Sequence, residues 1–248
     1  MNLGLKNKVV FVTGASSGIG RACAEQFGKE FAYVIVGYRN NKEIADQVVE
    51  NIKDNGGDGF AVRLDLSDLN SLDACVKEIE GRVGKIHSLI LNAGENSLTP
   101  FDAIEEDEWD ALLSSNLKGP YFLLKKMIPL FANSASAVFV ASIAGQTGAP
   151  GHAHYAAAKA GTINLSKSAA KFFASRVRVN CVSPGLTMTR MGEEAIKGAN
   201  PEYLQKKLLS RRAATPGEIA NVVVFMASPA ASFVYGATID VNGGRELR

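Results

Sequence analysis

The feature that most limits how this chain can fold is a short apolar run followed directly by a glycine-rich turn. Residues 9–12 read VVFV, residues 13–20 read TGASSGIG, and a helix-like stretch continues from Arg21. Glycines let the backbone turn sharply and approach a pyrophosphate, while the free N–H groups at a helix start face the anion. Alone, the glycines also suit an ordinary tight turn. The strand pattern before them and the helix pattern after them favour a nucleotide site, although the spacing is GxxxGxG rather than GxGxxG.

Short apolar runs alternate with helix-like stretches along the whole chain. Runs that are apolar throughout indicate strands covered on both faces, and the helices between them supply the crossovers that parallel pairing requires. We therefore expect an α/β fold: a Rossmann-like, doubly wound parallel sheet of about seven strands with helices on both faces, in one domain over residues 1–248. The expected strands are 8–13, 33–37, 59–64, 88–92, 137–142, 177–183 and 237–241, and the expected helices are 19–31, 41–55, 68–83, 105–132, 153–174 and 216–227.

Charge and cysteine usage narrow the class of protein. The net charge is +2 and no run of Lys and Arg stands out, so we expect neither a nucleic-acid nor a membrane partner. Cys23, Cys75 and Cys181 are odd in number and lack metal-ligand spacing, which favours buried free thiols over disulfides or zinc. No signal-like N terminus and no apolar run of roughly 20 residues is present, so we expect a cytoplasmic protein.

Tyr155 and Lys159 are four residues apart, which places both side chains on one face of a helix. An ammonium beside a phenol favours the phenolate, so a Tyr with an ordinary pKa of about 10 could exchange protons nearer neutral pH. That is what proton delivery to a carbonyl oxygen requires. A solvent-facing pair on an alanine-rich helix is the alternative for the two residues taken alone.

Ser142 follows the apolar run 137–141 and precedes Tyr155 by thirteen residues. Ligands of α/β sheets gather at the carboxyl ends of the strands, so a hydroxyl there is placed to hydrogen-bond a substrate oxygen. An isolated serine at this point would otherwise be a turn or cap residue.

These motifs, together with Asn92-Ala93-Gly94, resemble the short-chain dehydrogenase/reductase family from about residue 6 to residue 244. Within that family the chain is most similar to bacterial 3-oxoacyl-[acyl-carrier-protein] reductases, through residues 155–161 (YAAAKAG), 179–185 (VNCVSPG) and 240–244 (DVNGG). Sugar, steroid and alcohol dehydrogenases share those stretches, so they indicate the family better than the substrate. Leu91 stands where relatives often have a second Asn.

The resemblance implies which residues contact a dinucleotide. Asp65 and Leu66 would meet the adenine, although Asp65 could instead cap a helix. Thr187 would contact the nicotinamide carboxamide, with Thr189 as a competing candidate. The cofactor-binding residues expected in this way are Gly14, Ser16, Ser17, Gly18, Ile19, Gly20, Arg39, Asp65, Leu66, Asn92, Gly94, Tyr155, Lys159 and Thr187.

Arg39 decides the expected cofactor. After the second expected strand an NAD site usually has an acidic residue for the ribose hydroxyls, whereas this sequence reads Tyr38-Arg39-Asn40. A guanidinium binds a 2′-phosphate that a carboxylate would repel, so we expect NADP(H) to be preferred and NAD(H) to be possible. The alternative is a solvated surface Arg39, and Ser17 stands where many NADP-preferring relatives have a basic residue.

The expected catalytic residues are Ser142, Tyr155, Lys159 and Asn116. Tyr155 would be the general acid in reduction and the general base in oxidation, and Ser142 would hold and polarise the carbonyl. Lys159 would lower the Tyr155 pKa and, by resemblance, hold the nicotinamide ribose. Asn116 would, by resemblance, support a water chain to the lysine, and an ordinary polar surface residue is its alternative.

Two histidines, an aromatic stripe and a glycine-containing segment could also have functional roles. We expect no metal site, because His152 and His154 diverge on a helix and no carboxylate or cysteine lies near them in sequence. His154 would shape the substrate pocket or cap a helix, and Trp109 with the stripe at 121–124 would be core or subunit interface. Residues 186–212 contain Gly192, Gly198 and Pro201 among charged residues, which suggests a movable segment over the site.

Three functions remain open. The first is an NADPH-dependent reductase of 3-oxoacyl groups on acyl carrier protein. The second is a dehydrogenase of a free small alcohol, sugar or ketone, and the third is a cofactor-binding or scaffolding relative without turnover. An acidic carrier needs a basic surface, and residues 131–136 lack basic side chains. The resemblance also implies a homotetramer. The candidate carrier contacts are Arg176, Arg178, Arg190, Arg211 and Arg212.

Overall fold

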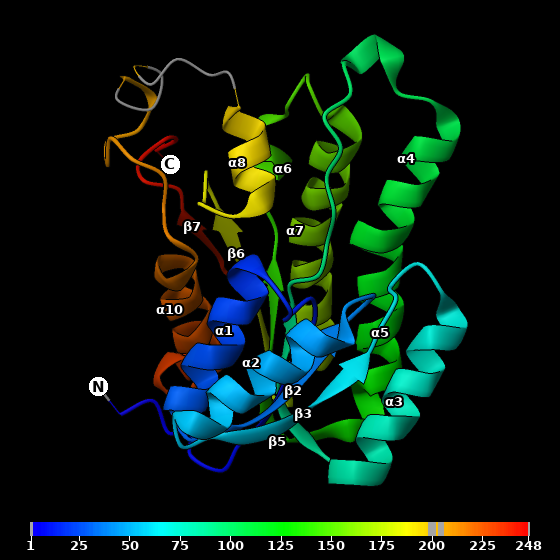
Figure 1. Cartoon of the computed structure of the whole chain (residues 1–248), viewed down its shortest axis with the longest axis vertical. Helices are drawn as coiled ribbons and strands as arrows, with labels where there is room; N and C mark the ends of the chain where they lie inside the picture. Colours follow the sequence, from blue (N-terminus) through cyan, green and yellow to red (C-terminus); the bar gives the residue numbers. More distant parts are fainter. Residues whose placement is uncertain (1, 198–201, 203–205, 248) are drawn as a thin grey trace.

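Strand β1 lies inside a seven-stranded parallel sheet whose order is β3-β2-β1-β4-β5-β6-β7 (Figure 1). The computed structural model describes residues 2–197, 202 and 206–247. The chain leaves β1 for β2 on one side and later enters β4 on the other, so the strand order reverses beside β1. A crevice therefore opens at the carboxyl ends of β1 and β4, where open α/β sheets bind ligands. The strands are β1 (Val9–Val12), β2 (Tyr33–Tyr38), β3 (Asp58–Arg63), β4 (Ile86–Leu91), β5 (Phe131–Val140), β6 (Val177–Pro184) and β7 (Thr238–Val241).

Helices cover both faces of this sheet. Helices α1 (Gly18–Lys29), α2 (Lys42–Asp54) and α10 (Pro216–Ala227) pack on one face. Helices α3 (Leu69–Val83), α5 (Gly119–Met127) and α7 (Ala153–Phe173) pack on the other. The expected fold class is thereby confirmed.

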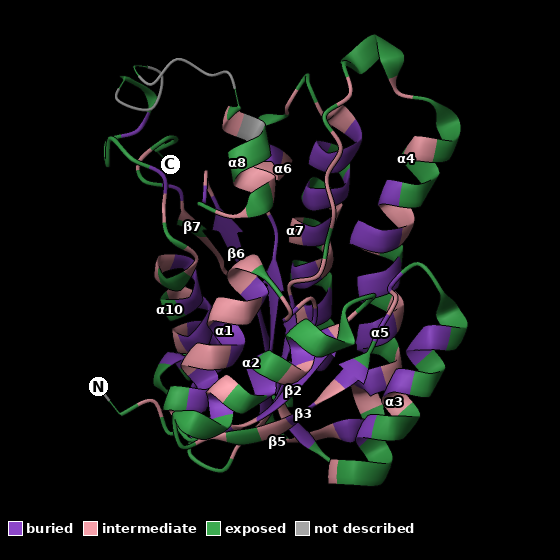
Figure 2. Cartoon of the chain, in the orientation of Figure 1, coloured by how far each residue is buried: buried purple, intermediate pink, exposed green. Residues whose placement is uncertain are grey.

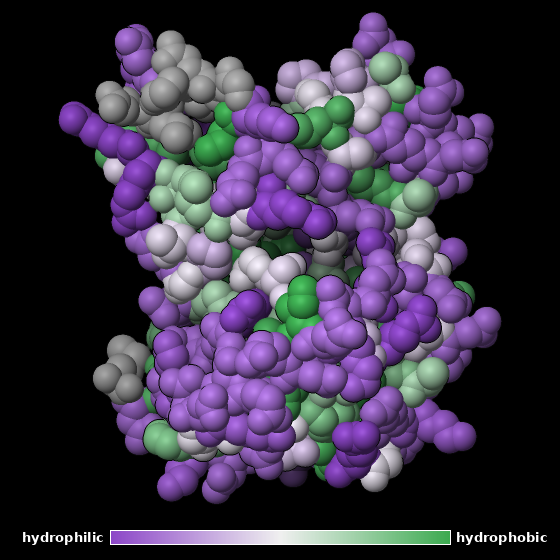
Figure 3. Space-filling model, in the orientation of Figure 1, coloured by the Kyte–Doolittle hydropathy of each residue, from purple (hydrophilic) through white to green (hydrophobic). Residues whose placement is uncertain are grey.

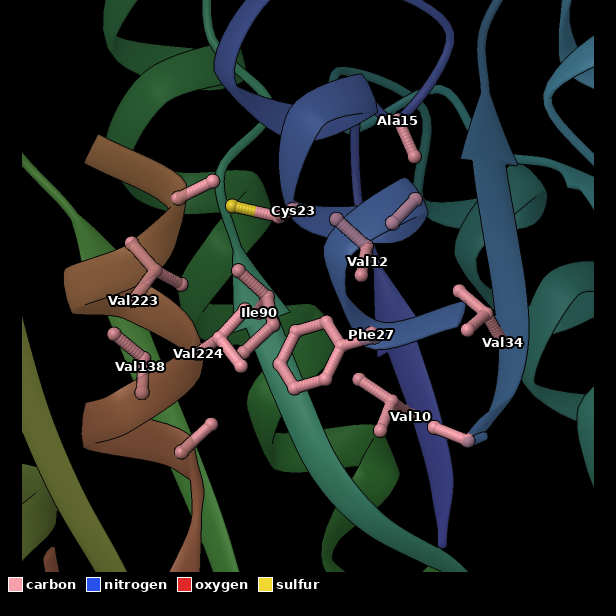
Figure 4. Packing of buried hydrophobic residues seen from close by; sticks show 14 of the residues in the cluster. Val10, Val12, Ala15, Cys23, Phe27, Val34, Ile90, Val138, Val223 and Val224 are labelled. Atoms are coloured by element: carbon pink, nitrogen blue, oxygen red, sulfur yellow. The ribbon is translucent and has the colours of Figure 1, made fainter. Parts of the chain in front are cut away.

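The two apolar layers follow from the two-residue period of a strand. Val10 and Val12 of β1 face the layer under α1 and α10, whereas Phe11 between them faces the layer under α3 and α5. Figure 4 shows the ring of Phe27, from α1, lying between Val10 and Ile90. Burying a side chain of that size stabilises the fold by roughly 2–3 kcal/mol. The central strands are mostly buried, whereas the edge strands β3 and β7 and the outer helix faces carry intermediate and exposed residues, as Figure 2 shows.

The end of α10 is held by a buried cation. Thr215 caps the start of α10 through a reciprocal capping box with Glu218. Arg178, in β6, donates to the carbonyl oxygens of Met226, Ala227, Ser228 and Ala231 at distances of 2.9–3.2 Å. The expectation that Arg178 contacts a carrier protein is therefore wrong, because its guanidinium is buried and satisfies carbonyls that a helix end leaves free.

The expected helix over 105–132 is divided and ends earlier. It consists of α4 (Glu106–Leu113), the π-helical turn η2 (Ser114–Lys118), α5 and the 3-10 turn η3 (Ile128–Leu130). Strand β5 then begins at Phe131, six residues before the expected 137, because Phe131 pairs with Ile86 and the register shifts before Ser88. Among helices of the described residues, none combines the length and the apolar character that crossing a bilayer demands.

Candidate active site

The glycine turn has the backbone geometry of an anion site. Gly14 and Gly18 have φ of 63° and 55°, which side chains rarely adopt. Helix α1 starts at Gly18, and its N-cap Ser17 makes no side-chain capping bond. The first turn of α1 carries no acidic residue. The N–H groups of the first turn, with the positive end of the helix dipole, therefore remain available to a phosphate.

Close packing leaves this turn no room for side chains. A Cβ on Gly14 would lie 2.9 Å from the Cα of Ala93, and a Cβ on Gly20 would overlap the carbonyl oxygen of Gly14. The glycines at these positions are therefore required by sterics as well as by conformation.

Thr13 and Asn92 bind the turn to the end of β4. The Thr13 hydroxyl accepts from the N–H groups of Asn92 (3.0 Å) and Ala93 (2.9 Å) and donates to the carbonyl of Ile90 (3.2 Å). The Asn92 amide donates to the Thr13 carbonyl at 3.0 Å. Asn92 was expected beside the ribose, and its side chain fixes the turn. Thr13, the first residue of the glycine motif, received no role from the sequence although it is fully buried.

Arg39, directly after β2, forms an ion pair that the sequence did not suggest. Its Nη1 lies 3.0 Å from Oε2 of Glu95, four residues beyond β4. Both side chains are about half exposed, at 48% and 43%. Arg39 is thus at the carboxyl edge of the sheet, as expected, but it is not an unpaired surface charge.

Asp65 follows β3 at the same edge. Its carboxylate accepts from the N–H (3.0 Å) and hydroxyl (2.6 Å) of Ser67. Burial would raise the Asp65 pKa, but the Ser67 hydrogen bonds and the positive charge of Arg39 hold it below its usual value. The alternative that Asp65 caps a helix is wrong, because Asp68 is the N-cap of α3. The side chain of Leu66 is buried in the apolar layer under α3 and α5.

Ser142 and Tyr155 meet where β5 and β6 end. The N–H of Ile143 donates to the Pro184 carbonyl at 3.0 Å, which ties the segment after β5 to the end of β6. Tyr155, in the first turns of α7, is 8% exposed and hydrogen-bonds Ser142. The Ser142 hydroxyl also accepts from the Ala144 N–H at 3.2 Å. The alternative that Tyr155 faces solvent is therefore wrong.

Lys159 lies one turn further along α7 and is also buried. Its Nζ donates to the carbonyl of Val140, the last residue of β5, at 3.0 Å. Burial lowers the Lys159 pKa to about 8. The ammonium nitrogen lies 5.7 Å from the centre of the Tyr155 ring.

The pKa of Tyr155 differs from the sequence-based expectation. Burial raises it, and the hydrogen bond with Ser142 opposes that rise. Lys159 is not among the groups that shift it. The expected lowering by Lys159 is thus wrong here, because desolvation of the phenol outweighs any attraction between the two groups.

Asn116 lies in the π-helical turn η2 and is 1% exposed. The alternative that it is an ordinary polar surface residue is therefore wrong. Its amide donates to the Glu95 carbonyl (2.7 Å) and accepts from the Glu95 N–H (2.9 Å). A Cβ on Gly94 would lie 2.7 Å from Asn116 Oδ1 and 3.3 Å from Lys159 Nζ. Gly94 therefore lets Asn116 and Lys159 approach each other, and π-turns of this kind are frequent at functional sites.

The segment after β6 approaches the glycine turn. The buried Thr187 hydroxyl donates to the Gly185 carbonyl at 3.1 Å. Thr189 caps the short helix α8 (Arg190–Ile196) by accepting from the Gly192 N–H at 3.1 Å. The Thr189 methyl carbon would lie 3.2 Å from a Cβ on Gly18. Gly198 and Pro201 of the expected movable segment lie outside the described residues.

Two histidines adjoin Tyr155 without forming a metal site. The His152 ring stacks on the Tyr155 ring with centroids 5.3 Å apart and planes at 12°, a contact the sequence did not suggest. His152 Nδ1 lies 3.0 Å from Asn96 Oδ1, and burial lowers the His152 pKa. His154 is fully buried, with Nε2 2.7 Å from the Ser97 hydroxyl. It does not cap α7, whose N-cap is His152. Within the described ranges, no three His, Cys, Asp or Glu side chains gather as metal ligands.

The aromatic stripe divides between surface and core. Trp109 and Tyr121 are 38% and 45% exposed, so neither belongs to the core, which was one of the two expected positions. Leu123 and Leu124 are buried. All three cysteines are buried and free, as expected.

The assembled site fits a dinucleotide. The free N–H groups of the glycine turn, the Arg39 guanidinium, the half-buried Ser142 and the buried Tyr155 and Lys159 all lie at the carboxyl edge of the sheet. In Figure 3 the largely hydrophilic face is hollowed between α8 and the α1–α2 region, and less polar residues show in the hollow. Thr13, Glu95 and His152 contact residues of the candidate site, and the sequence motifs predicted none of these contacts.

Comparisons with known proteins agree with this geometry. A family model described as "Enoyl-(Acyl carrier protein) reductase" matches residues 14–246. The chain is 39% identical over 240 residues to the 3-oxoacyl-[acyl-carrier-protein] reductase FabG of Staphylococcus aureus, covering 96% of this chain and 97% of that protein. It is 36% identical to FabG of Thermotoga maritima, covering 97% and 98%.

Solved structures are similar over nearly their whole length. The angucycline C-6 ketoreductase LanV with bound NADP has a TM-score of 0.89 at 29% identity, covering 97% of this chain and 96% of its own. A short-chain dehydrogenase/reductase from Brucella melitensis, described as glucose/ribitol dehydrogenase, has a TM-score of 0.89 at 31% identity, covering 98% of both chains.

Proposed function

The chain belongs to the short-chain dehydrogenase/reductase family of oxidoreductases, and on that premise we propose that it reduces 3-oxoacyl groups carried by acyl carrier protein, using NADPH. The observation that carries the proposal is the convergence of Ser142, Tyr155 and Lys159 beside the glycine turn. Their hydroxyl, phenol and ammonium groups are buried or half-buried at the end of one strand pair. Relatives named 3-oxoacyl-[acyl-carrier-protein] reductase, 35–39% identical over nearly the whole chain, support the substrate class.

The proposed chemistry divides between the cofactor and the protein. When bound, the nicotinamide supplies the hydride that reduces the carbonyl carbon. Ser142 donates a hydrogen bond to the carbonyl oxygen, and Tyr155 transfers its phenolic proton to that oxygen as negative charge develops. Because burial raises the Tyr155 pKa, the phenol stays protonated at neutral pH and can act as a general acid.

Lys159 and Asn116 have supporting roles in this proposal. Lys159, whose pKa is lowered to about 8, exchanges protons near neutral pH and holds the nicotinamide ribose. Asn116 is placed by its bonds to Glu95 and supports a water chain toward Lys159. Positions Gly14, Ser16, Ser17, Gly18, Ile19 and Gly20 would hold the pyrophosphate, and Arg39 the 2′-phosphate, while Thr187 would contact the carboxamide.

A panel of substrates tests the proposal. Purified protein is mixed with NADPH and acetoacetyl-[acyl carrier protein], a free 3-oxoacyl thioester, simple ketones and sugars, and cofactor oxidation is followed at 340 nm. The proposal expects the highest kcat/KM for the carrier-bound 3-oxoacyl group. Higher kcat/KM for a free ketone or sugar would replace it with the second hypothesis, which the Brucella melitensis neighbour favours. No turnover of any substrate would support a non-catalytic relative.

Carrier recognition depends on fewer cations than the sequence suggested. Arg178 is buried, and Arg212 pairs with Glu218 through two bonds of 2.8 and 2.6 Å. Arg176, Arg190 and Arg211 are exposed candidates. Substituting each by Glu should raise KM for the carrier-bound substrate more than for the free thioester, because only the carrier presents an acidic surface.

The proposal includes a homotetramer. A surface pocket of about 800 Å³ lies along α4, α5 and α7, with Leu117, Tyr121, Phe122 and Leu165 in its lining. Exposed aromatic side chains on helix faces are typical of subunit interfaces. Light scattering tests whether the protein is a tetramer. The cytoplasmic location remains a separate prediction.

A further inference from the structure

The Arg39–Glu95 ion pair lies across the adenosine end of the cofactor site. Arg39 follows β2 and Glu95 follows β4, and the sheet order places β1 between those two strands. The glycine turn leaves the carboxyl end of β1, so a pair that links the segments after β2 and β4 crosses over it. Strands are about 4.8 Å apart, so two long side chains bridge the intervening strand.

Glu95 is not free to move away as a whole. Its N–H donates to Asn116 Oδ1 at 2.9 Å and its carbonyl accepts from Asn116 Nδ2 at 2.7 Å. Because Asn116 is buried, both bonds are protected from water. The backbone at Glu95 is therefore fixed, and only its side chain can leave Arg39.

Arg39 faces a second carboxylate as well. The positive charge of Arg39 acts on Asp65, but the Asp65 carboxylate accepts its hydrogen bonds from Ser67. Glu95 is thus the hydrogen-bonded partner of Arg39, and Asp65 adds negative potential nearby.

We infer, building on the proposed use of NADPH, that Glu95 sets how strongly the protein discriminates between NADP(H) and NAD(H). A 2′-phosphate recognises Arg39 through charge-assisted hydrogen bonds and competes with Glu95 for the guanidinium. The carboxylate left behind then repels the phosphate. A 2′-hydroxyl carries no charge, so NAD(H) meets neither cost.

The size of the effect follows from the exposure of the pair. Half-exposed ion pairs contribute little, so a dianionic phosphate can displace Glu95. Removing the carboxylate should therefore tighten binding of 2′-phosphorylated nucleotides about 2–5-fold, the range of a surface charge effect. The effect should shrink with added salt, because both groups contact solvent.

Binding calorimetry on the full chain tests the inference without any turnover. Dissociation constants are measured for NADPH, NADH and adenosine 2′,5′-bisphosphate with wild type, Glu95→Gln, Arg39→Gln and the double variant. Glu95→Gln should raise the ratio Kd(NADH)/Kd(NADPH) about 2–5-fold and tighten the bisphosphate by the same factor. In the Arg39→Gln background, Glu95→Gln should change these constants less than about 2-fold, because competition for the cation is gone and only repulsion by the carboxylate remains.

A matched control separates local from general charge effects. Glu50→Gln removes an exposed carboxylate that pairs with Lys53 in α2, and it should leave the ratio unchanged. An unchanged ratio in Glu95→Gln, or an equal gain with and without Arg39, would overturn the role of Glu95. A wild-type protein that binds neither cofactor would instead overturn the proposed function and the inference with it.

Discussion

The ammonium nitrogen of Lys159 lies 3.0 Å from the carbonyl oxygen of Val140, the last residue of β5. This bond joins α7, the helix that carries Tyr155, to the end of the strand that Ser142 follows two residues later. Gly145 allows the approach, because a Cβ there would collide with the backbone of Lys159. The geometry of the Ser-Tyr-Lys group therefore depends on sheet and helix packing as well as on the spacing within α7.

Because of Lys159, the free energy of unfolding should depend on pH in the alkaline range. Its folded-state pKa of about 8 lies below the value of 10.5 for an unperturbed lysine. Between these pH values the unfolded chain binds more protons than the folded one, so the free energy of unfolding rises with pH. Below about pH 8 the folded state bears the cost of burying the ammonium. Relative to Lys159→Met, the ligand-free wild type should gain at most about 3 kcal/mol from pH 8 to pH 10.5.

Urea denaturation at several pH values measures this difference. Lys171→Met, an exposed lysine in the last turn of the same helix, is the matched control and should run parallel to wild type. If the Lys159→Met curve also runs parallel to wild type, the buried ammonium does not titrate in this range.

Gly20→Ala should lower both the free energy of unfolding and the affinity for NADPH. The new Cβ would overlap the Gly14 carbonyl and the Asn92 amide, so the glycine turn must shift. Overpacking of this kind costs about 1–3 kcal/mol. Gly81→Ala is the control, because Gly81 lies in α3 with open space around its Cβ position.

The two alanine variants should move in opposite directions. Gly81→Ala should stabilise the protein by about 0.5–1 kcal/mol, since it removes freedom from the unfolded chain. Chemical denaturation and NADPH titration measure both effects. Wild-type NADPH affinity in Gly20→Ala would show that the turn does not hold the pyrophosphate.

Arg178→Met should destabilise the protein without touching the site. Four carbonyl oxygens around the end of α10 would lose their donor, and charged hydrogen bonds contribute about 1.5–3 kcal/mol each before relaxation. We expect a loss of at least about 2 kcal/mol. Arg176→Met, at an exposed position two residues earlier, should cost less than about 0.5 kcal/mol. Equal unfolding free energies for the two variants would contradict the structural role of Arg178.

The sequence predicted the elements that rest on local pattern. Uniformly apolar runs identified the parallel sheet, and the fixed spacing within one helix or turn identified Tyr155, Lys159 and the glycine motif. These signals are short-range, because a strand, a turn or a helix face is defined by a few consecutive residues.

The remaining features depend on neighbours far apart in the chain. The early start of β5 at Phe131 follows from its pairing with Ile86, and the role of Arg178 follows from the end of α10, about fifty residues away. The raised Tyr155 pKa arises because tertiary packing desolvates the phenol, which sequence spacing does not reveal. The ion pair between Glu95 and Arg39 depends on the sheet, which brings together two residues that are far apart in the sequence.

The most direct test of the account is the rate of NADPH oxidation by Tyr155→Phe with a 3-oxoacyl thioester. The ring and its stack on His152 are retained, so folding and NADPH affinity should match wild type. Loss of the phenolic proton should lower kcat about 10²-fold or more, the usual contribution of a general acid. Tyr33→Phe, in β2, is the control and should keep the wild-type rate. A Tyr155→Phe protein that folds, binds NADPH and turns over at nearly the wild-type rate would contradict the assignment of Tyr155 as the proton donor.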